Sequence, residues 1–111
     1  MDNLEQLRDV IEKVLNEYAA YVPDDESFEK RTVFDRERDQ YLFVTFGWNG
    51  KRRVHNCDIH IEIRNEKIWI ESDNTEEGIA LDLENAGVPK EKIVLGFRHP
   101  EIRPYTEYAA A

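Results

Sequence analysis

Three side chains that can bind metal ions alternate along one stretch of the sequence: Asp58, His60 and Glu62. Alternate residues of a β-strand share a face, so these three could place ligand atoms around one ion. The same alternation is typical of any half-buried strand with one polar face, and this simpler interpretation is favoured. We therefore expect no metal site, and we keep these three residues as the candidates.

A second pattern approximates a metal-dependent nuclease, in which an acidic residue and an acidic-x-lysine step hold the ion that stabilises phosphoryl transfer. The nearest match is Asp39 with Glu62, Ile63 and Arg64. Arginine stands where lysine is needed, and these two cations are not equivalent. The formal net charge of −9 also opposes a DNA substrate. A nuclease-like enzyme remains the alternative to a non-catalytic role.

Cys57 is the only cysteine, which excludes a disulfide within the chain and favours a reducing compartment such as the cytoplasm. A thiol nucleophile needs a histidine on its own side. His60 is three residues away, on the opposite face of a regular strand, whereas His55 shares the face of Cys57. We interpret Cys57 as a small buried apolar residue. With no glycine-rich phosphate loop either, we expect no catalytic residue and no cofactor.

Composition limits the classes of protein that remain. A chain of 111 residues has room for one domain, residues 1–111, and its five Phe, five Tyr and two Trp supply a core. The charge of −9 repels phosphate backbones and anionic lipid, so we expect no direct binding of nucleic acid or membrane, whereas a basic protein would be attracted. Apolar runs fall far short of the roughly 20 residues that span a bilayer, which predicts a soluble cytoplasmic protein.

Hydrophobic spacing predicts the elements that position these residues. The N-terminal stretch has helical spacing in Leu4, Leu7, Ile11, Val14, Leu15 and Tyr18, with Asn3 as the cap. Strands are predicted at 28–35, 40–48, 52–64 and 67–72. The pair Asn49-Gly50 predicts a type I′ hairpin turn, and Asn65-Glu66 predicts a weaker two-residue turn. The four strands should form an antiparallel meander.

The C-terminal third predicts a second helix over about 76–86, which Gly87 ends and Pro89 prevents from continuing. Residues 93–97 form a short apolar run that fits either a strand or one turn of helix, and we favour the strand. Residues 99–111 are expected to form an ordered tail or a partner-binding arm. The predicted fold class is α+β.

One cluster of cations, Lys51, Arg52 and Arg53, follows the hairpin turn. It could contact phosphate or an acidic partner. The simpler interpretation is a solvated hairpin end, because three cations are fewer than a basic patch normally has.

Several short motifs follow one another along the chain in a defined order. They are Gly47-Trp48, Arg52-Arg53-Val54, Cys57 before Ile59-His60-Ile61, Lys67-Ile68-Trp69-Ile70, Thr75-Glu76 before Gly78-Ile79-Ala80, and Gly87-Val88-Pro89-Lys90 leading to Ile93-Val94-Leu95-Gly96-Phe97. In order and spacing these motifs resemble the XisI family, the fdxN element excision controlling factors. Asp58 departs from the pattern, since an apolar residue is expected there.

The resemblance implies a non-catalytic accessory factor. Such a factor acts with XisH, so that a site-specific recombinase can excise a DNA element during heterocyst development in cyanobacteria. An XisH-like protein is therefore the expected partner, and self-association through exposed aromatic residues is a further alternative. Candidate partner-binding residues, from the family-like motifs and the tail, are Trp48, Arg52, Arg53, Trp69, Thr75, Glu76, Arg103 and Tyr105.

Overall fold

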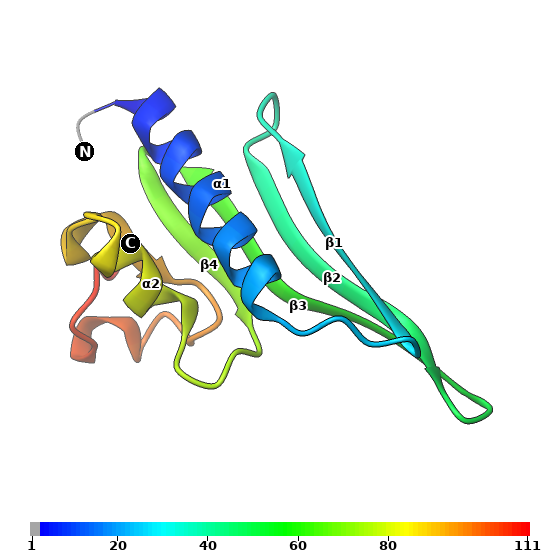
Figure 1. The fold of residues 1–111 in the computed structure, drawn as a ribbon. Helices are drawn as coiled ribbons and strands as arrows, with labels where there is room; N and C mark the ends of the chain where they lie inside the picture. Colours follow the sequence, from blue (N-terminus) through cyan, green and yellow to red (C-terminus); the bar gives the residue numbers. More distant parts are fainter. Residues whose placement is uncertain (1–2) are drawn as a thin grey trace.

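The computed structural model describes residues 3–111 (Figure 1). The elements are α1 (Leu4–Tyr21), β1 (Phe28–Asp35), β2 (Gln40–Asn49), β3 (Arg52–Arg64), β4 (Lys67–Asp73), α2 (Ile79–Asn85), the 3₁₀ turn η1 (Lys90–Lys92), β5 (Ile93–Leu95) and the 3₁₀ turn η2 (Arg103–Tyr105). Within the described residues the strands form a single sheet in the order β1-β2-β3-β4-β5. The predicted α+β class, with an N-terminal helix and a four-stranded meander, is confirmed.

β5 confirms the strand interpretation of the apolar run that starts at Ile93. It pairs with β4 in parallel, whereas the four preceding strands pair antiparallel. A parallel neighbour needs a crossover connection, and α2 supplies it between β4 and β5. The tail continues past this edge, where the Ala109 N–H donates to the Ile93 carbonyl at 2.8 Å. The tail is therefore ordered against β5.

Both helices pack on one face of the sheet, which we call the covered face (Figure 1). α1 begins where Asn3 Oδ1 accepts the Gln6 N–H at 2.8 Å, as predicted. Its apolar stripe is buried against the sheet and comprises Leu7, Val10, Ile11, Val14 and Leu15. The sheet contributes Tyr41, Phe43, Ile59, Ile61, Ile68 and Ile70, and α2 contributes Ile79 and Leu83. No helix in residues 3–111 has both the length and the apolar character needed to cross a membrane.

Of the two predicted hairpin turns, the one at Asn49-Gly50 differs from its prediction. Asn49 pairs with Arg52 as the last residue of β2, so the loop is Gly50-Lys51 and only Gly50 has a positive φ, of 63°. The prediction of two positive φ angles at Asn49-Gly50 is wrong, because this loop needs only the one that glycine supplies. The predicted two-residue turn at Asn65-Glu66 is confirmed, because Arg64 pairs with Lys67, and this turn has the two positive φ angles, 53° at Asn65 and 61° at Glu66.

α2 is shorter than the predicted 76–86 and begins at Ile79. The Asp73 carboxylate accepts the N–H groups of Thr75 at 2.9 Å and Ile79 at 2.7 Å, which holds the intervening residues in a loop. This side chain caps the helix from six residues away. The C-terminal end is as predicted: Gly87 has φ 105°, and the Val88 N–H bonds to the Leu83 carbonyl at 3.0 Å.

Candidate functional site

The face of β1, β2 and β3 opposite the helices, which we call the open face, carries a cluster of arginine and aromatic side chains near the β2–β3 hairpin. The Arg31 and Arg53 guanidinium carbons lie 5.4 and 5.7 Å from the centre of the Phe46 ring. Arg53 also lies 5.1 Å from the Trp48 ring, and the His55 ring centre is 6.1 Å from that of Phe46. We call Arg31, Phe46, Trp48, Arg53 and His55 the Phe46 patch.

Strand pairing explains why residues far apart in sequence meet here. Phe46 lies opposite His55, and Trp48 opposite Arg53, in the β2–β3 ladder. Arg31 reaches Phe46 diagonally from β1, where it pairs with Val44. At such separations cation–π attraction contributes about 0.5–1 kcal/mol on an exposed surface. The contacts hold the arginine side chains over the rings, so this surface is organised before any partner arrives.

Apolar side chains continue the open face away from the patch. Val33 is 46% exposed, and its neighbours Leu42 and Val44 on β2 are half-buried. Trp48 is 53% exposed at the hairpin end. A continuous row of partly exposed apolar residues on a sheet is typical of an interaction surface rather than of a free one.

The three predicted metal candidates do not share one face of the sheet. β3 has a bulge at Asp58, because Phe43 pairs with Ile59 while Val44 pairs with Cys57. The Asp58 carboxylate accepts the Thr45 hydroxyl at 2.7 Å, on the covered face. A bulge inserts one residue and so reverses the order of faces on either side of it. The expectation that Asp58 shares a face with His60 and Glu62 is therefore wrong.

His60 and Glu62 lie together on the open face, and both contact Gln40. Gln40 Oε1 is 2.7 Å from His60 Nε2, and its Nε2 donates to Glu62 at 2.9 Å. The Asp39 carboxylate of the nuclease-like pattern points instead to α1, where Arg8 donates to it at 2.8 Å. Within residues 3–111, no three His, Cys, Asp or Glu side chains gather as a metal-binding group.

Cys57 is exposed, so its interpretation as a buried residue is wrong. The bulge at Asp58 again supplies the reason: Cys57 pairs with Val44 on the open face instead of joining Ile59 in the core. Partial loss of hydration raises the pKa of the thiol, and the negative charge of Asp58 raises it further. A raised pKa leaves less thiolate at neutral pH, which weakens Cys57 as a nucleophile.

Two of the predicted partner-binding residues, Trp69 and Arg103, make their main contacts within the chain. Trp69 is only 7% exposed, and guanidinium groups cover it: Arg64 lies 3.8 Å from its ring centre and Arg103 lies 5.1 Å away. Arg103 also donates to the carbonyls of Arg98 and Gly96, both at 3.0 Å. This arrangement fastens the segment after β5 to the sheet and leaves Trp69 little surface for a partner.

The other candidates are dispersed. Trp48 and Arg53 are in the Phe46 patch, and Arg52 is exposed beside it. The Thr75 hydroxyl binds Asp73 and the Gly78 N–H within the loop before α2, and Glu76 is exposed in that loop. Tyr105 is 87% exposed in η2. The structure thus brings the candidates together in two places: the hairpin candidates on an exposed surface, and Trp69 with Arg103 in a largely buried contact.

Sequence reasoning missed Arg31, Phe46 and His55 as members of one surface. The alternation along β1 and β2 gave a usable signal, because Arg31 and Phe46 fall on the polar or half-buried parity of their strands. A second signal was charge, because residues 40–57 contain one Lys, two Arg and no Asp or Glu. Joining β1 to this surface required the β1–β2 register.

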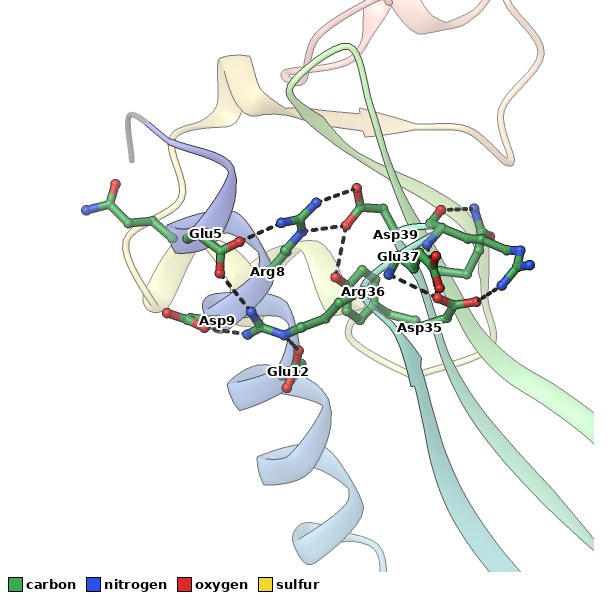
Figure 2. A network of polar contacts seen from close by, with 12 residues as sticks. Glu5, Arg8, Asp9, Glu12, Asp35, Arg36, Glu37 and Asp39 are labelled. Atoms are coloured by element: carbon green, nitrogen blue, oxygen red, sulfur yellow. Dashed lines mark hydrogen bonds and ion pairs between the residues drawn. The ribbon is translucent and has the colours of Figure 1, made fainter.

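The surface of α1 has the opposite character (Figure 2). Arg36, from the β1–β2 turn, contacts three carboxylates one helical turn apart, those of Glu5 at 2.9 Å, Asp9 and Glu12. Hydrogen bonds raise the pKa of the Arg36 guanidinium, the bond to Asp9 most and the bond to Glu12 next. The acidic side chains of α1 thus fasten the turn to the helix.

Comparison with known proteins identifies the family. The family model described as XisI protein matches residues 1–110. A crystal structure of a XisI-like protein from Anabaena variabilis ATCC 29413 superimposes with a TM-score of 0.92 at 36% identity, covering 98% of this chain and 100% of that one. The fdxN element excision controlling factor XisI of the same organism gives 0.81 at 38% identity, covering 95% and 96%. No curated protein matches. The chain belongs to the XisI family.

Proposed function

We propose that this chain is a non-catalytic accessory protein that acts with an XisH-like protein in the excision of a DNA element by a site-specific recombinase. The solved relative named an fdxN element excision controlling factor supports a regulatory role, since it is 38% identical over nearly the whole chain. The observation that carries the proposal is the open face. It has partly exposed apolar and arginine side chains, an arrangement that suits protein contact.

The chemistry of the described residues supports this role over a nuclease. A two-carboxylate metal site needs both carboxylates near one point, but Asp39 contacts Arg8 of α1 and Asp58 contacts Thr45 on the covered face, while Glu62 lies on the open face. The raised pKa of the Cys57 thiol leaves less thiolate at neutral pH, which weakens it as a nucleophile. The strongly acidic chain also favours contact with a protein over contact with DNA.

The test is co-expression with an XisH-like protein from the same organism, with a tag on one of the two. We expect the untagged protein to follow at fixed stoichiometry through affinity and size-exclusion columns. Mixing the purified proteins at micromolar concentration should give a measurable heat of binding. Separate elution of two folded proteins with no heat would refute the proposal.

A further inference from the structure

We propose that the Phe46 patch docks a protein surface that presents carboxylates around an apolar centre. This inference rests on the proposed function, and it names the face of this chain and the chemistry of the partner. The patch lies where the β2–β3 hairpin projects beyond the end of α1 (Figure 1). A projecting end allows a partner to approach without meeting either helix.

The apolar part of the patch supplies a centre for an interface. Trp48 is 53% exposed, Phe46 is half-buried beside it, and Val44 extends the surface along the same strand. Tryptophan and arginine are enriched among the residues that dominate binding energy, particularly when a partner excludes water from them. Trp48 and Arg53, already in contact at 5.1 Å, are such a pair.

Charge identifies the kind of partner. Residues 40–57 carry three Lys and Arg and no acidic residue, so the 24 Asp and Glu and the other 12 Lys and Arg give the remainder of the chain a formal charge of −12. Arg31 contacts the neighbouring Glu29 at 2.8 Å, whereas Arg53 contacts aromatic rings and has no carboxylate partner within residues 3–111. Complementary potential at an interface requires an anionic surface opposite these guanidinium groups.

A second copy of the chain fits this face poorly. A twofold axis would place Arg31 and Arg53 of one copy against the same residues of the other, and like charges in a dry interface oppose binding. Docking the patch on the acidic α1 of another copy would be heterologous, and such contacts build rings or open filaments rather than a simple dimer.

Nucleic acid also fits poorly. The Arg31 and Arg53 guanidinium groups lie over the Phe46 ring, where a base would need to stack. The charge of −12 on the rest of the chain repels a phosphate backbone at long range. An acidic protein surface keeps the arginine pairs, and because its carboxylates can be confined to the part that meets the patch, it experiences less of this repulsion than a continuous phosphate backbone.

The experiment measures binding of the full-length chain to the XisH-like protein by isothermal titration calorimetry. The test variant is Arg31→Glu/Arg53→Glu. The control is Lys13→Glu/Arg98→Glu, which changes net charge equally at exposed positions on α1 and after β5. Circular dichroism and thermal melts establish that both are folded. We expect the test variant to lose at least tenfold in affinity, Trp48→Ala to lose a comparable amount, and the control to change less than threefold.

The outcomes separate this inference from the proposed function. If the wild-type chain binds and the test and control variants bind equally well, the patch is not the docking site, although the proposed function stands. If the wild-type chain binds no XisH-like protein, the proposed function fails, and the random copolymer poly(Glu,Tyr) becomes the probe. Binding of the copolymer that only the patch variant loses supports the inference. No binding, or equal loss in test and control, overturns it.

A single-stranded oligonucleotide probes the competing occupant. Fluorescence anisotropy with labelled oligo(dT) should show binding weaker than that of the protein partner or copolymer. Tighter binding to oligo(dT), lost in Arg31→Glu/Arg53→Glu, would overturn the assignment of a protein occupant.

Discussion

Similar side chains are buried on the covered face of the sheet and partly exposed on its open face. Phe43 and Phe46 lie three residues apart on β2, yet Phe43 is fully buried beneath α1 while Phe46 lies half-exposed under two guanidinium groups. Cations differ likewise. Arg36 lies among three carboxylates of α1, whereas Arg53 lies over aromatic rings. The side chains of the covered face pack within the chain, whereas the open face leaves apolar and arginine side chains exposed to solvent.

The largest expected contrast comes from truncating the two phenylalanines. Phe43→Ala leaves a cavity in the core and should lower the free energy of unfolding by about 3–5 kcal/mol. Phe46→Ala loses only partly buried area and should cost less than about 1.5 kcal/mol. Urea unfolding followed by circular dichroism measures both. Equal costs would show that the open face is part of the core rather than a surface.

A second prediction concerns Gly47, where the chain before β1 crosses β2. A methyl group there would lie 2.0 Å from the Ser27 carbonyl oxygen and 2.9 Å from the Phe28 Cα atom. Gly47→Ala should therefore destabilise the protein by about 1–3 kcal/mol and weaken partner binding, because β1 carries Arg31. Gly50→Ala is the control, since it meets no atom within 4 Å and adds only the strain of φ 63°. If the control is the more damaging change, close approach at Gly47 is not limiting.

The carboxylate contacts of the covered face should respond to salt. Arg36→Ala removes three carboxylate contacts to α1 and leaves Glu5, Asp9 and Glu12 to repel one another. We expect a lower melting temperature in low salt and a smaller difference from wild type in 0.5 M NaCl, because salt screens exposed charges. Arg31→Ala, on the open face, should change the melting temperature less. A difference that persists unchanged at high salt would contradict an electrostatic role.

Alkaline pH should weaken the covered face. Burial raises the pKa of Tyr41, and its hydrogen bond to Asp39 raises it further, while burial and Glu84 raise the pKa of Tyr108 to about 12. A raised pKa means that the folded protein holds the proton more tightly, so stability is complete below about pH 10 and falls as pH rises above it. The urea midpoint should decline less steeply between pH 9 and 11 in Tyr41→Phe. Tyr105→Phe, at an exposed site, should follow wild type.

The smallest expected effect is that of divalent metal. Because Asp58 and Glu62 lie on opposite faces of β3, Mn²⁺ or Mg²⁺ should bind no more tightly to the wild-type chain than to Asp58→Ala or Glu62→Ala. Isothermal titration calorimetry and thermal shift with 1 mM metal measure this. Tight binding that either substitution abolishes would revive the nuclease alternative.

The local signals in the sequence were enough for most of the elements. Helical spacing predicted α1 and its Asn3 cap, and period-two alternation predicted the positions of strands β1 to β4. Gly87 and Val88 correctly predicted where α2 ends, because the hydrogen bonds of that motif join residues within six positions of one another. Such features depend on a residue and its near neighbours in the chain, so the sequence alone determines them.

Tertiary structure decided which side chains meet. The bulge at Asp58 exists only through the register of β3 on β2, and it moved Asp58 to the covered face and Cys57 to the open one. Since the side-chain period of a strand is two, one inserted residue exchanges the faces, and no pattern within β3 reveals this. The start of α2, held by Asp73 from six residues away, and the union of Arg31 with Phe46 likewise depended on contacts between separate segments. The sequence alone therefore determined the elements and the charge of the hairpin, whereas pairing between strands decided the surface that a partner would meet.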